Sequence, residues 1–470
     1  MTRGIHWFRN DLRLHDNTAL EALVSRVDEW LPVFVIDPRI AGSGDSETPR
    51  VRFLLDCVDR LGRALEKRGV PLIVRAGRPD RVLPRLLRET RAELLSFNED
   101  VTPFARQRDE VVRRRAEKQG VQLLSRVDHV VLPAAEVRTG TGTAYSVYSP
   151  YRKTWWRRWH EAPRRPIRMS RLPPPIPGFS SDPLVGSRPS DSGSSGIRLP
   201  TGGEEAGKRR LDRFLETAVG RYHEDRDRPD RDGTSRLSPY LRFGAISVRR
   251  CFERAEEAAA AEPSLRQGIA KWLDELIWRE FYSAILEENP RVMRESHRPE
   301  YEHVVWNDDL AGFEAWCDGR TGFPFVDAGM RQLRATGWMH NRARMVVASF
   351  LSKDLLIDWR EGERFFFEHL VDGDPASNNG GWQWAASTGT DAQPYFRIFN
   401  PIAQGRRWDP EGRYVRRWVP ELRDLPDEQV HAPWEAGRPV DYPPPRVDHA
   451  ERRVLAIERY RDARQRGEGG

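Results

Sequence analysis

The chain has 470 residues, enough for two or three domains with substantial buried cores. Its 77 Lys and Arg against 71 Asp and Glu leave a net charge of +6, which permits a nucleic-acid partner without requiring one. Three cysteines without metal-ligand spacing indicate reduced thiols and no metal site. The first residues do not resemble a signal sequence, and no apolar run is long enough to cross a membrane. We therefore expect a cytoplasmic protein that does not associate with membranes.

Residues 4 to about 130 alternate short apolar runs with amphipathic segments. This alternation of strands and helices predicts a parallel, Rossmann-like sheet covered on both faces. No GxGxxG follows the first strand, so the usual dinucleotide fingerprint is missing. We expect an α/β domain over residues 1–130, with strands over Ile5–Phe8, Leu31–Ile36, Pro71–Arg75, Glu93–Phe97 and Val121–Leu124 and helices that include Arg50–Arg68 and Phe104–Lys118.

A long linker is predicted over residues 131–205. Its second part, residues 163–205, is rich in Pro, Ser and Gly and cannot form a core, so it should lie over the surface or be mobile. From residue 206 onward, apolar residues recur at three- and four-residue spacing. We expect a second, all-α domain over residues 206–470, which makes the fold class α/β plus all-α.

The most unusual stretch is Asp372–Pro401, DGDPASNNGGWQWAASTGTDAQPYFRIFNP. Asn and Gly favour turns and caps, so we expect residues 378–381 to break or begin a helix rather than lie within one. Two tryptophans beside small polar residues suit a pocket for a flat ring. On composition alone, a Trp-rich core loop is an equally good reading.

Two further segments carry polar groups that suit a ligand. In TSRLSPYLRFG, Thr234 or Ser235 is expected to cap the following helix, whose free N–H groups also suit an anion. In WLDELIWREFY, Glu275, Trp278, Arg279 and Tyr282 share one helix face. Charged residues are rarely buried alone, so this face indicates either a ligand site or an interhelical salt bridge.

These segments, with IHWFRNDLRLHDNTAL at Ile5–Leu20 and GWMHNRARM at Gly337–Met345, resemble the photolyase/cryptochrome family over nearly the whole chain. The resemblance is strongest to class I cyclobutane pyrimidine dimer (CPD) photolyases. It implies an N-terminal antenna domain and a C-terminal helical FAD-binding domain.

The activity implied by the resemblance is light-driven repair of pyrimidine dimers in UV-damaged DNA, a carbon–carbon lyase reaction. An electron passes from excited, reduced FAD to a dimer flipped out of the duplex, a strategy that photolyases share with other enzymes acting on bases. A monomer is expected, and the alternative is a cryptochrome-type blue-light photoreceptor.

The resemblance also implies the residues of a flavin site. Arg344 and Asp372 resemble an ion pair against the isoalloxazine ring, where a cation stabilises the anionic reduced flavin. Asn378 resembles the residue that faces flavin N5, and Asp374 completes the pocket. The remaining implied FAD contacts, mostly around the pyrophosphate, are Tyr222, Thr234, Ser235, Arg236, Leu237, Ser238, Trp272 and Arg279.

For the reaction itself, the resemblance implies catalytic roles for Glu275, Asn378 and an electron relay of Trp382, Trp359 and Trp306. Trp278 would stack on the lesion, and Glu275 would bind its pyrimidine edges. Enzymes for the (6-4) photoproduct carry a His pair where this chain has Asn341 and Met345, which favours the cyclobutane dimer. The other implied lesion or DNA contacts are Arg226, Arg342, Trp384 and Arg397.

A second, light-harvesting chromophore is expected in the N-terminal domain. Folate-binding members carry an Asn-Glu pair where this chain has Pro103 and Phe104. The segments around Arg50 and Asp100 look more like those of members that bind 8-hydroxy-5-deazaflavin. We expect that chromophore, with a reduced folate or no antenna as alternatives.

Overall fold

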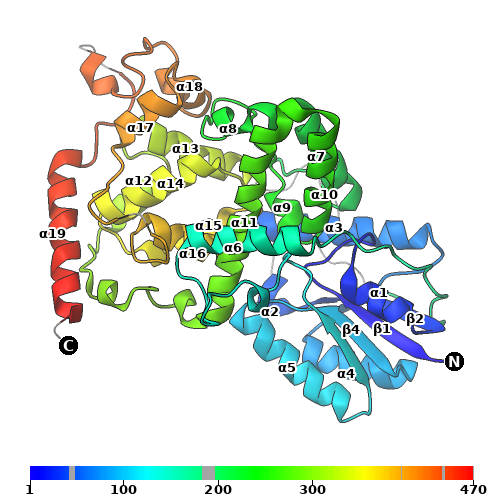
Figure 1. Ribbon diagram of the computed structural model, residues 1–470. Coiled ribbons are helices and arrows are strands. Elements are labelled where there is room, and N and C mark those ends of the chain that lie inside the picture. Colours follow the sequence, from blue (N-terminus) through cyan, green and yellow to red (C-terminus); the bar gives the residue numbers. More distant parts are fainter. Residues whose placement is uncertain (42–47, 183–195, 393, 437–439, 469–470) are drawn as a thin grey trace.

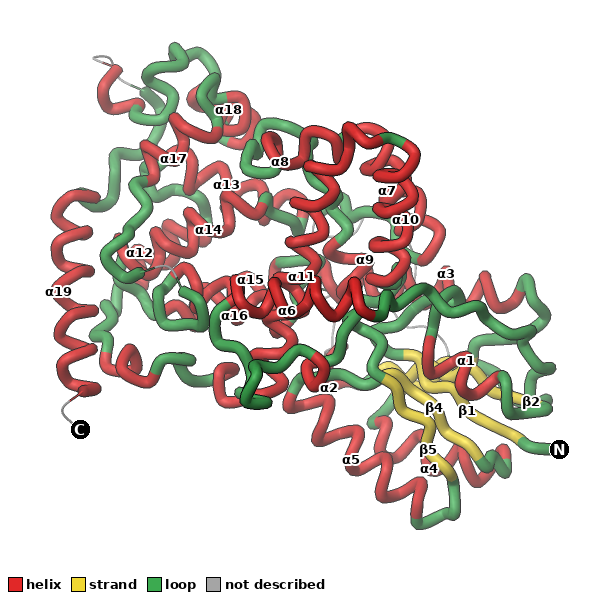
Figure 2. Tube along the Cα trace, in the orientation of Figure 1, coloured by secondary structure: helices red, strands yellow, loops and turns green. Residues whose placement is uncertain are grey.

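The computed structural model describes residues 1–41, 48–182, 196–392, 394–436 and 440–468. A sheet with its covering helices lies at one end of the molecule, and a larger helical body lies at the other (Figures 1 and 2). The five strands are parallel and ordered β3-β2-β1-β4-β5. Their bounds are β1 Arg3–Phe8, β2 Glu29–Ile36, β3 Ile73–Ala76, β4 Leu94–Asn98 and β5 Gln122–Arg126. The predicted fold class and all five predicted strands are confirmed.

Both faces of the sheet are buried, because its strands are apolar on both sides. One face packs on α4 (Pro79–Thr90) and α5 (Pro103–Glu117) through a cluster that includes Trp7, Leu31 and Leu87. The other packs on α1 (Thr18–Val24) and α3 (Pro49–Glu66). The apolar cluster of this second face continues without a break into the helical domain. A short α2 (Pro38–Ala41) follows β2.

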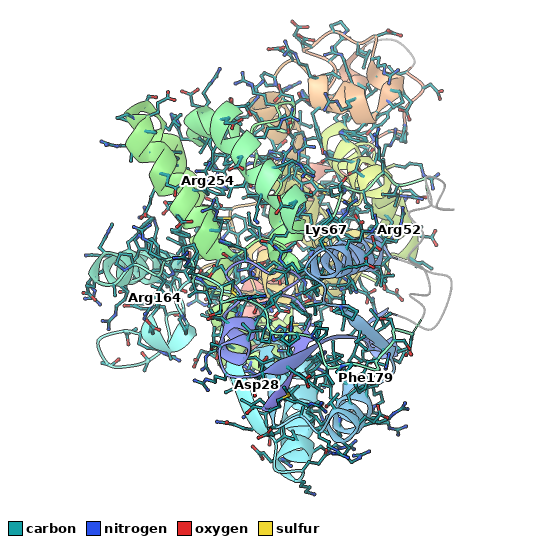
Figure 3. The ribbon with its side chains drawn as sticks, turned by 90° about the vertical axis from the view of Figure 1, so that its right-hand side faces the viewer. Asp28, Arg52, Lys67, Arg164, Phe179 and Arg254 are labelled. Carbon is teal, nitrogen blue, oxygen red and sulfur yellow. The ribbon has the colours of Figure 1, made fainter. Side chains whose placement is uncertain are left out.

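The predicted linker, residues 131–205, contains α6 (Tyr148–Glu161), whose Trp155 and Trp159 are buried in the helical domain. The chain then returns to the sheet, where Pro175 forms a parallel bridge with Trp30 of β2 and the Ile176 N–H donates to the Trp30 carbonyl at 3.0 Å. Ser181 and Asp182 hydrogen-bond to Val74 of β3. Arg164 and Phe179 lie on opposite sides of the molecule in Figure 3. Residues 163–182 thus lie along the surface, as expected, whereas α6 packs into the apolar core. Residues 183–195 lie outside the described residues, and the expected domain boundaries stay predictions.

The helical body surrounds a second apolar cluster, which includes Trp316, Phe350 and Trp359. Among the described residues, no helix is long and apolar enough to cross a membrane, and no His, Cys, Asp and Glu cluster suits a metal ion. A π-helical turn, Phe350–Asp354, follows α14. The helices are α7 Glu204–Thr217, α8 Tyr222–Asp225, α9 Ser238–Arg242, α10 Val248–Ala261, α11 Arg266–Glu288, α12 Leu310–Cys317, α13 Pro324–Thr336, α14 Asn341–Ser349, α15 Trp359–His369, α16 Pro375–Ala385, α17 Pro401–Trp408, α18 Arg413–Trp418 and α19 His449–Glu468.

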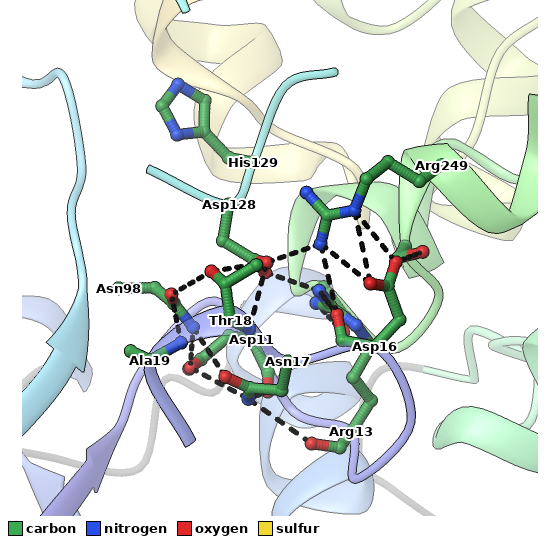
Figure 4. Close-up of polar contacts among 12 residues, drawn as sticks. Asp11, Arg13, Asp16, Asn17, Thr18, Ala19, Asn98, Asp128, His129 and Arg249 are labelled. Carbon is green, nitrogen blue, oxygen red and sulfur yellow. Dashed lines mark hydrogen bonds and ion pairs between the residues drawn. The ribbon is translucent and has the colours of Figure 1, made fainter. Parts of the chain in front are cut away.

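A buried network of ion pairs joins the two domains (Figure 4). Arg249 of α10 reaches Asp16 Oδ2 at 3.0 Å and Asp128 Oδ1 at 2.7 Å, and Arg13 pairs with the second oxygen of Asp128. All four side chains are less than a tenth exposed. Burial opposes ionisation of Asp128, but Arg13 and Arg249 outweigh it and hold the pKa of this carboxyl below its ordinary value. The network therefore depends on every member being present.

We predict that Arg249→Met lowers the free energy of unfolding by about 3–5 kcal/mol, because two buried carboxylates lose their shared partner. The change is measured from urea denaturation curves. Arg254→Met is the control, since Arg254 pairs with Asp212 at 3.1 Å on the partly exposed side of the same helix (Figure 3). Its expected cost is at most about 1 kcal/mol. Equal losses in the two variants would contradict the prediction.

Candidate functional site

The segment before α9 forms a tight turn held by backbone contacts. Arg210 Nε donates to the Ser235 carbonyl at 2.7 Å, and Ser235 Oγ accepts from the Leu237 N–H at 3.4 Å. The N-cap residue of α9 is Leu237, so the expectation that Thr234 or Ser235 caps this helix is wrong. The reason is the backbone of Arg236, whose φ of 49° turns the chain between those hydroxyls and the helix.

A buried carboxylate links three parts of the helical domain. Asp372, which precedes α16, accepts from Arg344 Nη2 of α14 at 2.8 Å and from Ser238 Oγ of α9 at 2.6 Å. Arg344 is further fixed by donating from Nε to the Met339 carbonyl at 2.8 Å. The structure therefore contains the expected Arg344–Asp372 pair and attaches it to the Ser238 segment.

Residues 378–381 lie inside α16, so the expectation that they break or begin a helix is wrong. The helix begins earlier because Asp374 caps it by accepting from the Ser377 N–H at 2.8 Å, with Pro375 in the first turn. Gly380 has a packing role, since a Cβ there would lie 2.1 Å from Cδ1 of Tyr282. Close contact between α16 and α11 thus outweighs the poor helix propensity of glycine.

Both asparagines of this helix are held by one residue of α15. Asn378 Nδ2 donates to the Glu363 carbonyl at 3.0 Å, and Asn379 Nδ2 donates to Glu363 Oε1 at 3.1 Å. Burial raises the pKa of the Glu363 carboxyl to about 7, against the opposing effect of the Asn379 hydrogen bond. The amide of Asn378 is therefore fixed in orientation before any ligand arrives.

The three tryptophans of the expected relay belong to one apolar cluster. Trp382 and Trp359 are buried, and Trp306 is partly exposed at the edge, where it contacts Tyr460 edge-to-face at 6.2 Å. The indole of Trp382 packs directly on α15, since a Cβ on Gly362 would lie 2.1 Å from its Cη2. The structure brings the three rings into one core with exposure rising toward Trp306, and their role in electron transfer stays a prediction.

The predicted face of α11 is present and carries contacts that connect it to other segments. Trp272 is buried against Phe214 of α7, with ring centroids 5.1 Å apart. Trp278 stacks on Tyr148 of α6 at 3.6 Å and an angle of 12°. Sequence analysis missed Tyr148, because nothing in the local pattern of the linker pairs it with a helix so distant in the chain.

The residues expected to face DNA gather around α8, α11 and α14. Arg226 pairs with Glu275, and Arg342 pairs with Asp227 at 2.8 Å while its guanidinium lies 4.7 Å from the centre of the Trp408 ring. Asp227 was also missed, although it stands in the charged run HEDRDRPD. The other residues expected at the lesion or DNA lie on α14, on α16 and beyond it: Asn341 and Met345 share one side of α14 with Nδ2 and Sδ 3.8 Å apart, Trp384 lies on α16, and Arg397 is exposed beyond it. Tyr222, which is expected at the flavin, is buried on α8.

A pocket opens between the domains at the carboxyl ends of the strands. Asp100 lines it and accepts from Asn10 Nδ2 at 3.0 Å. Burial raises the pKa of Asp100, but Arg242 and backbone hydrogen bonds outweigh it and bring the value to about 2. Arg279 and Asp374, expected at the flavin, line this same pocket. Arg50, the second expected antenna residue, has its guanidinium 3.7 Å from the ring centre of Phe367.

Comparison with known proteins identifies the family. The sequence model described as "DNA photolyase" matches residues 4–169, and "FAD binding domain of DNA photolyase" matches residues 272–462. The deoxyribodipyrimidine photo-lyase of Halobacterium salinarum is 40% identical, over 98% of this chain and 99% of its own length. The chain belongs to the DNA photolyase family.

Solved photolyase structures share the complete fold. A class III photolyase from Agrobacterium tumefaciens has a TM-score of 0.90 at 35% identity and covers 99% of this chain and 98% of its own. An archaeal photolyase from Sulfolobus tokodaii, solved with two FAD molecules, has a TM-score of 0.79 at 34% identity, with 98% and 100% covered. The matched FAD-binding region of the photolyase family begins at Trp272, so it contains α14, α16 and most of α11.

Two neighbouring glycines of the photolyase FAD-binding domain provide a test of how α16 packs. Gly380→Ala should destabilise the protein by about 1–3 kcal/mol, because the Tyr282 ring has no space for the added methyl group. Gly381→Ala should be neutral or stabilise it by up to about 1 kcal/mol, because the methyl group would meet open space among the described residues. Thermal and urea unfolding of both variants measure the difference, and a reversed order would show that this contact is not what positions the helix.

Proposed function

We propose that this protein is a CPD photolyase, which uses light to split cyclobutane pyrimidine dimers in DNA. The observation that carries the proposal is the match to deoxyribodipyrimidine photo-lyases over nearly the full length of both chains. The reaction is a carbon–carbon lyase reaction, and it leaves the two pyrimidines in place in the strand. Reduced FAD, when bound, supplies the electron that light delivers to the dimer.

The donor set of the helical domain fits FAD. Thr234, Ser235 and Ser238 offer hydroxyls and Arg236 a guanidinium, groups that suit the anionic pyrophosphate. Arg344, already paired with Asp372, places a cation where it stabilises an anionic ring. Asn378 presents a neutral amide fixed by its hydrogen bond to Glu363. Burial of Trp272 and Tyr222 supplies an apolar surround.

On the lesion side, the residues bind and orient the dimer. Trp278 is stiffened by its stack on Tyr148, so it offers a preformed platform for a flat base. Glu275 supplies a carboxylate for the N–H groups of the pyrimidine edges. Met345 and Trp384 form apolar walls, and Asn341 adds a polar contact. These identities favour a cyclobutane dimer over the (6-4) photoproduct, which calls for a His pair.

The deciding experiment measures loss of CPDs from a UV-irradiated oligonucleotide incubated with reduced protein, under blue light and in darkness. Light-dependent loss with none in darkness is expected. If the protein binds flavin and damaged DNA but removes no dimers under light, it is a photoreceptor of the cryptochrome type and the proposal is wrong.

The tryptophan relay reduces oxidised flavin and takes no part in repair by flavin already reduced. Trp382→Phe should therefore lose most photoreduction of oxidised flavin while repair by chemically pre-reduced protein stays within about twofold, because phenylalanine is harder to oxidise but fills similar space. Flavin absorbance under illumination and the CPD assay provide the two readouts. Loss of repair in the pre-reduced variant would show that Trp382 has a different role.

The antenna is 8-hydroxy-5-deazaflavin, held in the pocket that Asp100 lines and close to Arg50. The absence of the Asn-Glu pair at Pro103 and Phe104 supports this choice over a folate. The Sulfolobus relative, with its two FAD molecules, supports a flavin-like second chromophore. The mass of the chromophore extracted from native protein is the test: a deazaflavin mass is expected, and a folate mass would refute the assignment.

We further propose that the enzyme works as a monomer in the cytoplasm on UV-damaged DNA. Cys57, Cys251 and Cys317 are free thiols, which is typical of a reducing compartment. Sedimentation of the flavin-loaded protein should give the mass of one chain, and a stable dimer would contradict the monomer.

A further inference from the structure

Two of the three arginines expected to bind DNA phosphates beside the lesion, Arg226 and Arg342, are paired with acids. Arg226 Nη1 pairs with Glu275 Oε1, and Arg342 Nη2 lies 2.8 Å from Asp227 Oδ1. Asp227 also lies 3.9 Å from Arg226 Nε. The residues come from α8 and its C-terminal end, α11 and α14, which adjoin in the helical body (Figure 1).

The two pairs are incompatible with the DNA-bound roles of their members. A phosphate that binds Arg226 must displace the Glu275 carboxylate, or share the guanidinium with a like charge. The same holds for Arg342 and Asp227. The side chains of Asp227 and Arg342 are only 20% and 13% exposed, so solvent screens their attraction less than that of a surface pair.

Damaged and undamaged DNA differ in the contacts that they offer to the acids once these ion pairs are broken. Both offer phosphates, but a flipped dimer also offers N–H groups to Glu275, which compensates that carboxylate for the loss of Arg226. Undamaged DNA keeps its bases stacked and offers Glu275 no such donors, so this partly buried carboxylate would exchange Arg226 for the longer contact with Lys271 alone. Discrimination between a lesion and ordinary duplex therefore comes from the Arg226–Glu275 pair, whereas the Arg342–Asp227 pair opposes the phosphates of both.

We infer that Asp227 limits the affinity of this face for DNA, because its carboxylate competes with DNA phosphates for Arg342. The inference rests on the proposed function, because it assigns DNA roles to Arg226, Arg342 and Glu275. Asp227 itself touches neither the flavin nor the lesion in that scheme. It acts through the arginines.

Arg342 keeps a support when Asp227 is neutralised. Its guanidinium lies over Trp408, whose other neighbouring cation is Arg407, 4.5 Å from the centre of the ring. Lys271 lies 3.8 Å from Glu275 and adds a further cation on the α11 side. Removing the charge of Asp227 therefore leaves a positively charged face in which Arg342 is still oriented and free to accept a phosphate.

The test compares Asp227→Asn with the unaltered holoenzyme in binding, in darkness, to one duplex with a single CPD and to the same duplex without it. Affinity for both duplexes should rise roughly three- to tenfold in the variant, because each duplex presents the same backbone phosphates to Arg342. The slope of log K against log salt on undamaged DNA should steepen by about 0.9, as expected for one added phosphate contact.

The matched control is Asp225→Asn, which removes the same charge from α8. Asp225 pairs with Arg231 and lies 3.7 Å from Arg221, neither of which is expected to contact DNA beside the lesion. Its effect on the undamaged duplex should be smaller than twofold and should leave the CPD preference unchanged. If both variants raise the affinity for DNA equally, the effect comes from removing any negative charge in this region, and the assignment to Asp227 is wrong.

Weaker binding of both duplexes by Asp227→Asn would also overturn the inference, because it would mean that Asp227 holds Arg342 in its DNA-binding position. Flavin absorbance and circular dichroism confirm that each variant is folded. If the proposed function is wrong, the unaltered protein will bind the damaged and the undamaged duplex equally. The change in affinity for undamaged DNA on neutralising Asp227 still decides the competition for Arg342 in that case.

Discussion

The buried ion pairs of Arg249 with Asp16 and Asp128 fix the position of the N-terminal domain against the helical domain. The acids come from the N-terminal domain, and the arginine comes from the helix that follows the Ser238 segment. Two backbone contacts reinforce the junction, from Arg13 Nη1 to the Gly244 carbonyl and from the Leu12 N–H to the Phe243 carbonyl, both at 3.0 Å. A buried charge cluster tolerates little displacement, since any shift leaves a charge unpaired. The pocket that Asp100 and Arg279 line exists only because the sheet is held at this position.

Within the helical body, α16 is the element that fixes neighbouring helices in position. It is capped by Asp374, pressed against α11 through Gly380, and tied to α15 through Asn378 and Asn379. This single helix carries the residue expected at flavin N5, the first tryptophan of the relay and one wall of the lesion pocket. Asn378, Trp382 and Trp384, three residues expected to act at the flavin, in the relay and at the lesion, therefore share one rigid support, which holds them better than separate loops would.

Much of this arrangement was predictable from the sequence, and the exceptions have physical causes. The strands were predictable because continuous apolar runs such as Leu31–Ile36 are typical of a sheet buried on both faces. The position of residues 378–381 inside a helix was not predictable, because the helix propensity of glycine opposes it. Glycine is needed there because Tyr282, from a helix distant in the chain, packs directly against Gly380.

Family motifs indicated which side chains gather at the site, yet Tyr148 and Asp227 escaped notice. Their partners, Trp278 and Arg342, lie more than a hundred residues away in the chain, so the contacts depend on tertiary packing. No periodicity or local composition reports such a pair. The predicted cap of α9 was wrong for a related reason, since the backbone conformation of Arg236 cannot be inferred from its residue type.

The path of the linker along β3 has a further consequence. In a five-stranded sheet of this order, β3 is an outer strand whose free N–H and C=O groups could template pairing with another chain. Here the Val74 N–H is taken by Ser181 Oγ, its carbonyl by the Asp182 N–H, and the Ala76 N–H by Asp182 Oδ2. The connection between the domains thus also protects this strand from pairing with another chain. A nick or deletion in it would expose an unpaired, aggregation-prone sheet edge without altering the flavin site or the DNA-binding face.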